Sequence, residues 1–308
     1  MHLPSSLQKA SEWLRHQPTL GRWALKCVPD VRVKILIEPI GGFNIRLRRN
    51  RSFWLRHPLT HELFPLGALQ RLVKPDSVVY DVGANIGLYA RFMLQQFGAR
   101  CVVCFEPMTE NRAMLEDNIR AGDCARQVQI MPWALCDKEG EEDLQVDDMM
   151  SGSATLDRVT GGNAANGRKQ YGMEALTEKV SVARLDQLVA SHHLPPPNVI
   201  KVDIEGAEGL MLEGARETLR QHQPDLLIEL HGASVAGSVF STLTSLGYSC
   251  FGELNVDGRH QYTRVTQRMI DGLTDYYDLH FIVASTNPAK LEQPIEAYRS
   301  LSSPAFQP

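Results

Sequence analysis

The chain has 308 residues, a formal net charge of −4, and 43% hydrophobic and 22% charged residues. This composition is ordinary for a globular protein, and the chain is long enough to bury a large core without a covalent staple. The slightly acidic balance argues against nucleic acid or an anionic membrane as the main partner.

Six cysteines are scattered at positions 27, 101, 104, 124, 136 and 250. Cys101 and Cys104 have redox-motif spacing, but they fall inside a predicted strand whose successive side chains point to opposite faces. Reduced thiols in a cytoplasmic compartment are therefore expected. No apolar run reaches the ~18–20 residues of a transmembrane segment, and residues 1–22 lack the apolar core of a signal peptide.

Residues 1–60 are predicted to form an N-terminal extension of short amphipathic helices and a β-hairpin around Gly41-Gly42. The apolar face of the helices is expected to pack on the main domain or on a second copy, so the extension is a candidate surface for a homo-oligomer. Residues 61–290 are predicted to form the main domain. Residues 291–308 are predicted to be a tail that lies loosely on the surface.

A helix predicted at 62–72 leads into alternating strands and helices. Strands are predicted at 78–83, 101–106, 128–135, 198–204 and 225–230, and helices at 87–97, 109–121, 207–221 and 234–246. Two further strands, at 141–147 and 179–185, surround a polar, glycine-rich insert (148–175), which suits either a lid or an ordinary surface loop. The closing strands at 248–254 and 277–285 have no clear helix between them. The pattern predicts an α/β fold with a mostly parallel sheet, covered on both faces, and an antiparallel edge.

The strand that begins at Val78 ends in Asp81, and Gly83 and Gly87 follow four residues apart, just before a helix. Such a turn presents backbone N–H groups and one carboxylate to a small ligand. The carboxylate would repel a pyrophosphate and suits a ligand with ammonium or hydroxyl groups. The GxxxG spacing also differs from the GxGxxG of dinucleotide folds. A tight turn without a ligand is the structural alternative.

Glu106 ends the next strand about 20 residues after the glycine turn, where a carboxylate can accept hydrogen bonds from both hydroxyls of a ribose. Pro107 then terminates the strand. A strand-end acid that faces solvent is the alternative. Together with Asp81 and the glycines, Glu106 predicts a nucleoside site.

Two further acidic motifs follow strands. Asp203 and Glu205 lie two apart at a strand end and share a face, so contact with a substrate, a cation or a cofactor ammonium is expected. Two carboxylates are too few to assert a divalent metal. Glu208 suits the first turn of a helix. Glu229 and His231 close the next strand, where a neutral His231 would take a proton from a hydroxyl, or serve only as a hydrogen-bonded structural residue.

The ordered segments VVYDVGANIGLYA, FEP, ALCDKEG, ARLDQL, IKVDIEGAE and LLIELHG resemble the FkbM-type methyltransferases over roughly residues 55–285. The resemblance implies a class I, Rossmann-like methyltransferase fold with a seven-stranded sheet. It also implies S-adenosylmethionine as the methyl donor. The expected acceptor is a hydroxyl on a sugar, polyketide or related metabolite, which means a small-molecule or glycan partner.

The resemblance also implies roles for particular residues. Those matched to the methionine part of the cofactor are Asp81, Gly83, Asn85 and Gly87. Glu106, followed by Pro107, matches the ribose-binding acid. The region beside the adenine is matched by Trp133, Ala134 and Asp137. Glu62 matches an acid that recurs ahead of the core. The positions that face the transferred methyl are matched by Asp203, Glu205 and His231.

Methyl transfer to oxygen is an in-line displacement at a sulfonium, so the protein must align the acceptor and remove its proton. We expect His231 to be the base, or Asp203 and Glu205 to orient the hydroxyl, with or without a cation. The alternatives are a nicotinamide-dependent oxidoreductase and a non-catalytic binding protein on the same fold. N-methylation is a further alternative, although a proline-aromatic motif would typically replace residues 203–206.

Overall fold

The computed structural model describes residues 27–55, 59, 62–146, 154–159, 174, 176–256, 259–274 and 278–298. The helices expected in the first 22 residues, and most of the glycine-rich insert, lie outside these ranges. None of the helices described is long and apolar enough to cross a membrane. All six cysteines are free, as predicted.

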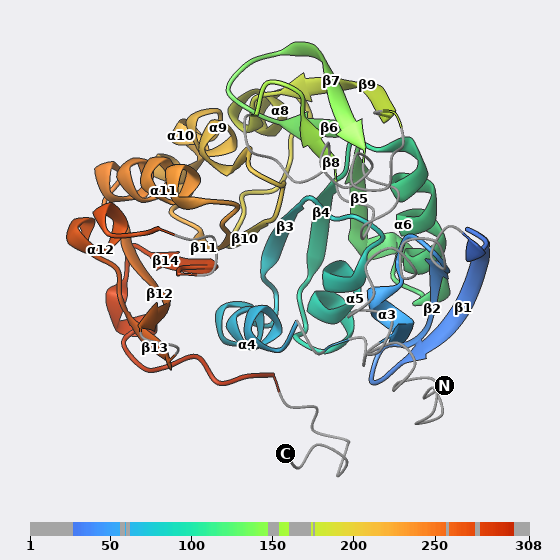
Figure 1. The fold of residues 1–308 in the computed structure, drawn as a ribbon, viewed down its shortest axis with the longest axis horizontal. Coiled ribbons are helices and arrows are strands. Elements are labelled where there is room, and N and C mark those ends of the chain that lie inside the picture. Colours follow the sequence, from blue (N-terminus) through green and yellow to red (C-terminus); the bar gives the residue numbers. More distant parts are fainter. Residues whose placement is uncertain are drawn as a thin grey trace.

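An eight-stranded sheet forms the centre of the molecule (Figure 1). Its strands are β3 (Val78–Val82), β4 (Cys101–Phe105), β5 (Val128–Met131), β10 (Val199–Val202), β11 (Asp225–Glu229), β12 (Ser249–Val256), β13 (Arg259–Arg264) and β14 (Phe281–Ser285). The spatial order is β13-β12-β14-β11-β10-β3-β4-β5. Neighbours from β11 to β5 pair in parallel, whereas β14, β12 and β13 pair antiparallel. The predicted Rossmann-like class I architecture with an antiparallel edge is confirmed, with β13 as one strand more than predicted.

Helices cover both faces of this sheet. One face carries α4 (Leu63–Leu72), α5 (Leu88–Gln95) and α6 (Thr109–Ala121). The other carries α8 (Leu185–Ser191), α9 (Glu208–Glu213), α10 (Arg216–His222), α11 (Ala233–Ser245) and α12 (Gln267–Asp271). Because strand side chains alternate, Val79 packs toward α4 and α5 while Tyr80 packs on the opposite face. The remaining short helices are α3 (Ser52–Leu55), η1 (Ala125–Gln127) and η2 (Pro288–Lys290).

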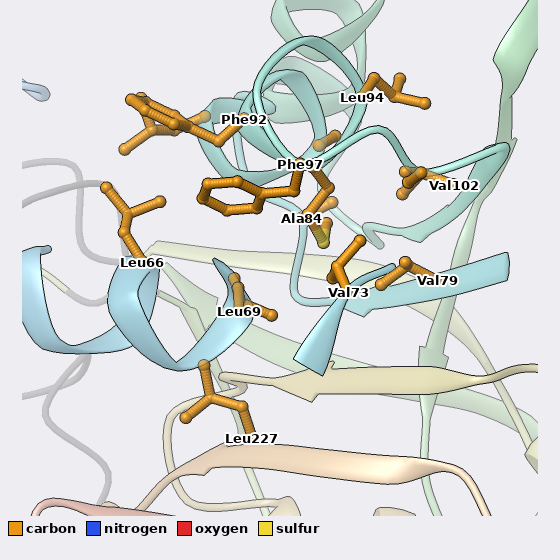
Figure 2. Packing of buried hydrophobic residues seen from close by; sticks show 14 of the residues in the cluster. Leu66, Leu69, Val73, Val79, Ala84, Phe92, Leu94, Phe97, Val102 and Leu227 are labelled. Atoms are coloured by element: carbon orange, nitrogen blue, oxygen red, sulfur yellow. The ribbon is translucent and has the colours of Figure 1, made fainter. Parts of the chain in front are cut away.

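The core beneath α4 and α5 fixes the position of the strand that leads to the glycine turn (Figure 2). Leu66 and Leu69 of α4 and Phe92 of α5 are completely buried in the same cluster as Val79. Removing one such leucine side chain typically costs about 2–5 kcal/mol. This packing therefore fixes the position of β3 and of the loop that follows it.

Two predicted elements are broken in the structure. The predicted strand 128–135 ends at Pro132, which has no N–H for a sheet ladder. Its second half, β6 (Trp133–Leu135), joins a four-stranded sheet of order β6-β9-β7-β8 with β7 (Gly140–Val146), β8 (Ala154–Leu156) and β9 (Leu176–Ala183). The predicted helix 207–221 divides into α9 and α10 at Gly214, where a Cβ would overlap the carbonyl oxygen of Cys136.

Both ends of the described chain pack on the main core. The predicted hairpin is confirmed as β1 (Arg32–Ile37) and β2 (Gly41–Arg46), and Phe43 of β2 is completely buried. Residues 291–298 are not the loose tail that was predicted. Tyr298 packs edge-on against Phe92, with ring centroids 5.5 Å apart, and its N–H donates to the carbonyl of Leu63 at 2.8 Å.

Candidate active site

A cavity of about 260 Å³ opens at the carboxyl ends of β3, β4 and β10. It lies where the strand order reverses, because β3 has β4 on one side and β10 on the other. Open α/β sheets bind ligands at such a point. The predicted site residues that line the cavity are Glu62, Gly83, Asn85, Glu106, Pro107, Trp133, Ala134, Asp203 and Glu205.

The glycine turn that follows β3 lies directly against the segment that follows β10. Gly83 has φ +75°, and a Cβ there would overlap the carbonyl oxygen of Asp203. Only glycine allows this close approach. Gly87 differs from the prediction, because it is not part of the cavity wall. It has φ +89° at the start of α5, and its missing side chain leaves room for Leu115 of α6.

Glu106 is a buried carboxylate held on the cavity wall. Its Oε2 accepts a hydrogen bond from the backbone N–H of Asn85 at 2.8 Å, and its Oε1 accepts one from Met108 at 3.0 Å. Burial raises the pKa of Glu106 to about 7, against the lowering effect of these two hydrogen bonds. Oε1 also accepts a longer bond from the side-chain amide of Asn111 at 3.5 Å, so Oε2 is the oxygen that retains a lone pair for a hydroxyl group from the cavity.

The residues predicted beside the adenine separate in the structure. Trp133 and Ala134 line the cavity from β6. Asp137 is not part of the wall: its Oδ1 lies 2.5 Å from a guanidinium nitrogen of Arg158, and that ion pair lowers its pKa. The structure therefore supports the first two residues as cavity contacts and gives Asp137 a different partner.

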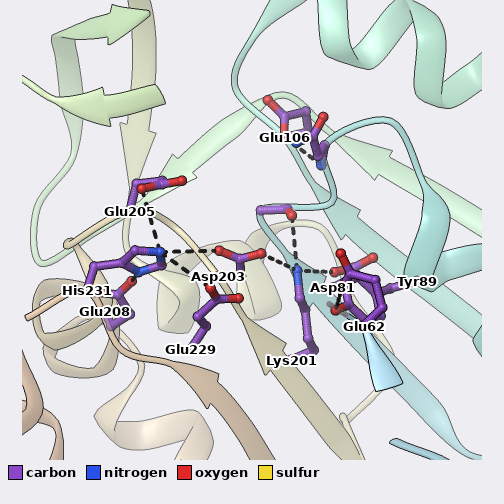
Figure 3. Close-up of polar contacts among 12 residues, drawn as sticks. Glu62, Asp81, Tyr89, Glu106, Lys201, Asp203, Glu205, Glu208, Glu229 and His231 are labelled. Atoms are coloured by element: carbon purple, nitrogen blue, oxygen red, sulfur yellow. Dashed lines mark hydrogen bonds and ion pairs between the residues drawn. The ribbon is translucent and has the colours of Figure 1, made fainter. Parts of the chain in front are cut away.

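Asp81, which was predicted to face a ligand, is completely buried and does not line the cavity. Lys201 of β10 lines the cavity instead. Its Nζ is 3.5 Å from Asp81 Oδ1, 3.3 Å from Asp203 Oδ2 and 3.3 Å from the Gly83 carbonyl (Figure 3). Burial raises the pKa of Asp81, although Lys201 partly offsets this. Burial alone would lower the pKa of Lys201, but the carboxylates of Asp203 and Asp81 outweigh it and raise the pKa, so the ammonium is charged.

Glu62 lies just before α4 and lines the same side of the cavity. The hydroxyl of Tyr89 donates a hydrogen bond to Glu62 Oε2, and Lys201 Nζ lies 4.6 Å from the centre of the Tyr89 ring. Burial raises the pKa of Glu62 to about 7, although the bond from Tyr89 lowers it. The prediction placed Glu62 at the site, but it did not include Tyr89 or Lys201.

Four carboxylates surround the imidazole of His231 (Figure 3). Nδ1 lies 2.6 Å from Oε1 of Glu208. On the other side of the ring, Nε2 lies 3.6 Å from Glu205, 3.8 Å from Glu229 and 3.9 Å from Asp203. The last three residues line the cavity, and the His231 ring lies behind them with 6% of its side chain exposed.

The protonation of His231 differs from the neutral state that was predicted. Burial alone would lower its pKa, but the hydrogen bond with Glu208 and the nearby carboxylates raise it to about 10. The ring therefore carries a proton at neutral pH in the ligand-free protein. Burial raises the pKa of Glu205 to about 7, with partial compensation by His231. Glu205 also has φ +52°, in the left-handed region that non-glycine residues seldom adopt.

The cavity wall includes residues that were given no role from sequence. Lys201 and Tyr89 come from the core motifs and Met108 directly follows one, while Ser52 and Phe53 come from the extension. A lysine inside an apolar strand was the one available signal, because a buried charge requires a partner. Nothing in the sequence of the extension indicated that it would reach the cavity.

Comparison with known proteins places these features in a family. The FkbM methyltransferase domain matches residues 81–250. The chain is 26% identical over 199 residues to the hexuronic acid methyltransferase AglP of Haloferax volcanii, covering 64% of this chain and 74% of AglP. It is 30% identical over 152 residues to the 2-O-methyltransferase NoeI of Sinorhizobium fredii, covering 48% of this chain and 61% of NoeI.

Two further matches are partial. The match to the AMB antimetabolite synthetase AmbE of Pseudomonas aeruginosa, 27% identical over 184 residues, covers 52% of this chain but only 9% of AmbE. The crystal structure of an FkbM methyltransferase from Methylobacillus flagellatus aligns with a TM-score of 0.43 and 18% identity, over 68% of this chain and 43% of that one. Because the family match takes in more than half of the 308 residues, the chain belongs to the FkbM methyltransferase domain family.

Proposed function

We propose that this protein is an S-adenosylmethionine-dependent O-methyltransferase that acts on a hydroxyl of a sugar, polyketide or related metabolite. The observation that carries the proposal is the setting of Glu106. Two backbone N–H groups fix this carboxylate on the wall of a cavity at the strand-order reversal. A nucleoside ribose fits such a carboxylate.

The charges of the cavity favour a donor without phosphate. Its described wall contains five carboxylates, those of Glu62, Glu106, Asp203, Glu205 and Glu229. Lys201 is the one basic side chain of that wall, and it is already shared by two aspartates. A pyrophosphate would meet unfavourable charge here, whereas a sulfonium and an ammonium are attracted.

In the proposed reaction, the methyl group of the donor lies beside the cluster around Asp203. A lone pair of the acceptor oxygen forms the new O–C bond while the C–S bond breaks. The electron pair of the C–S bond stays on sulfur, and the product is S-adenosylhomocysteine. The acceptor proton goes to the carboxylate of Glu205, which lines the cavity, and then to solvent. His231, protonated in the ligand-free protein, fixes the neighbouring carboxylates rather than acting as the base in that state.

Cofactor binding tests the donor. S-adenosylmethionine and S-adenosylhomocysteine should each raise the midpoint of thermal unfolding, and at 100 times Kd they should stabilise by about 2.7 kcal/mol. NAD should not. A calorimetric titration that finds NAD binding as tightly as S-adenosylhomocysteine would favour the oxidoreductase. A folded protein that binds neither would favour the non-catalytic alternative.

Turnover tests the residues. In methyl transfer to a panel of hydroxyl-bearing acceptors, Asp203→Ala, Glu205→Gln and His231→Ala should each lose roughly 10²-fold or more in kcat. Glu217→Gln removes an exposed carboxylate of α10 and should match the native protein. Near-native turnover in all three site variants would remove this mechanism, provided that each still binds S-adenosylhomocysteine.

A further inference from the structure

The side chains of Asp203, Glu229 and His231 each place one ligand atom within 4.8 Å of the others. Two atoms bound to one small divalent cation lie roughly 3–4.5 Å apart, since metal–ligand bonds are about 2.0–2.3 Å long. The distances of 3.8 and 3.9 Å from His231 Nε2 to Glu229 and Asp203 fall in this range. His231 therefore has the spacing of a co-ligand to both carboxylates, and the remaining pair, Asp203 and Glu229, lies within 4.8 Å.

Each of these three side chains is oriented by a further residue. Glu208 lies 2.6 Å from His231 Nδ1, which directs Nε2 toward the cluster. Lys201 holds Oδ2 of Asp203 and leaves Oδ1 on the side of His231. The Nε2–H of His280 donates to Glu229 at 2.9 Å. Metal sites characteristically fix their ligands through such outer hydrogen bonds.

An independent observation comes from Glu208, which is completely buried on α9. Its Oε2 has no hydrogen-bond partner among the described residues, although Oε1 is bonded to His231. A buried carboxylate without full compensation is costly, and here three more carboxylates lie within 4 Å of the same ring. The four carboxylates around the ring outnumber their cations, which are the His231 ring itself and Lys201, and Lys201 is shared with Asp81. A divalent cation bound to His231 would supply further positive charge.

We propose that Asp203, Glu229 and His231 bind a divalent cation of the Mg²⁺ and Mn²⁺ class at the cavity wall, where it coordinates the acceptor hydroxyl. This site rests on the proposed function for its role, but not for its ligands. Carboxylates suit such hard cations, and a single imidazole is compatible with Mn²⁺. With the ion on Nε2, His231 binds as the neutral ring and Nδ1–H donates to Glu208.

The ion would orient and acidify the acceptor. A hydroxyl oxygen bound to a divalent cation loses its proton more readily, and the ion holds the oxygen in line with the methyl group. The proton passes to Glu205, which lies next to the ligands but is not one of the three. The oxygen then forms its bond to the methyl carbon as the C–S bond of the sulfonium breaks. The ion is unchanged by the transfer.

Metal binding is measurable without turnover. Protein stripped with EDTA and dialysed is titrated with Mn²⁺, with and without S-adenosylhomocysteine, by calorimetry and by the loss of the free Mn²⁺ signal in electron paramagnetic resonance. One Mn²⁺ should bind per chain. Glu229→Gln and His231→Gln should weaken binding at least about tenfold, and Glu208→Gln by about 10- to 100-fold. Glu217→Gln should bind as the native protein does, because its carboxylate is exposed on α10.

Each variant must retain its affinity for S-adenosylhomocysteine, which shows that it is folded. Native protein that binds S-adenosylhomocysteine but no Mn²⁺ overturns the metal site and leaves the proposed function intact. Equal Mn²⁺ binding by Glu229→Gln and native protein also overturns it. Binding of glucosamine by the metal-free protein through Glu229 would overturn it as well, because the ammonium of an acceptor would then supply the positive charge that the metal was proposed to supply. Mn²⁺ binding without any S-adenosylhomocysteine binding would support the site and reject the proposed donor.

Discussion

The two sides of the cavity are stabilised in different ways. The proposed cofactor side consists of the turn at Gly83–Asn85 and of Glu106, whose carboxylate is held by backbone N–H groups of that turn and of the loop after β4. The proposed acceptor side consists of Asp203, Glu205, Glu229 and His231, which are held by one another's charges. The first side depends on local chain geometry and the second on charge balance between separate strands. The local structure of the cofactor side should therefore tolerate changes of charge, and that of the acceptor side should not.

Lys201 is where the two sides are most strongly coupled. It lies between Asp81 beneath the cofactor side and Asp203 of the acceptor side, with 4% of its side chain exposed. Lys201→Met leaves Asp81 buried without its cation and should lower the free energy of unfolding by about 3–5 kcal/mol. Urea unfolding monitored by circular dichroism measures this loss.

The double variant Lys201→Met with Asp81→Asn tests the cause of that loss, because it removes the uncompensated charge. It should be more stable than Lys201→Met alone. Lys179→Met breaks an exposed pair with Asp143 and should change stability by no more than about 1 kcal/mol. If the double variant is no more stable than the single one, the charge of Asp81 is not what Lys201 compensates.

Gly83 couples the sides through backbone contact rather than charge. Gly83→Ala would push a methyl group into the carbonyl of Asp203 at a positive φ, with an expected loss of about 2–4 kcal/mol. Gly247→Ala is a matched control, since Gly247 has a similar φ of +84° but no atom within 4 Å of the added Cβ. That variant should lose only about 1–2 kcal/mol. Equal losses in urea unfolding would mean that the contact with Asp203 contributes nothing.

The smallest effect concerns pH and isolates the cofactor side. The Glu106 carboxyl has a pKa of about 7, and ribose hydroxyls donate to its ionised form. Affinity for S-adenosylhomocysteine should therefore be about tenfold weaker at pH 6 than at pH 8. Folding has the opposite sign: because the folded carboxyl binds its proton more tightly than the unfolded one, this group's contribution to stability falls as pH rises from roughly 4.5 to 7.

Calorimetry at both pH values, on native protein and on Glu106→Gln, checks this prediction. The variant should bind more weakly and lose most of the pH dependence. Glu62 and Glu205 also have pKa values of about 7, so an unchanged pH dependence in Glu106→Gln would assign the effect to them.

Sequence reasoning was most successful where function depends on one strand and the loop that follows it. The strand-end position of Glu106 predicted its place on the cavity wall, and the glycine spacing predicted the turn at Gly83. The same reasoning placed Asp81 on β3 but not its partner, because a strand pattern does not reveal which lysine lies opposite. The proton on His231 was also missed, since Glu208 meets it only once α9 packs beside β11.

Other differences have equally specific causes. The end of the strand before Pro132 could have been predicted from the proline itself. The Asp257-Gly258 pair, a hairpin signal in the sequence, could likewise have predicted β13. The packing of Tyr298 could not have been predicted, because it depends on rings more than 200 residues earlier in the chain. Contacts between distant segments limited the prediction, whereas the elements themselves were mostly recognised.

The position of β14 sets the order in which the molecule can assemble. This strand is the last of the sheet to be synthesised, yet it inserts between β11 and β12. Until Ser285 has left the ribosome, β11 has an unpaired edge of the kind that recruits other chains. His280, which holds Glu229, arrives with the same segment. The wall of the cavity around Glu106 is thus built from residues synthesised before β14, while Glu229 on the proposed acceptor side lacks its contact with His280 until that segment has been made.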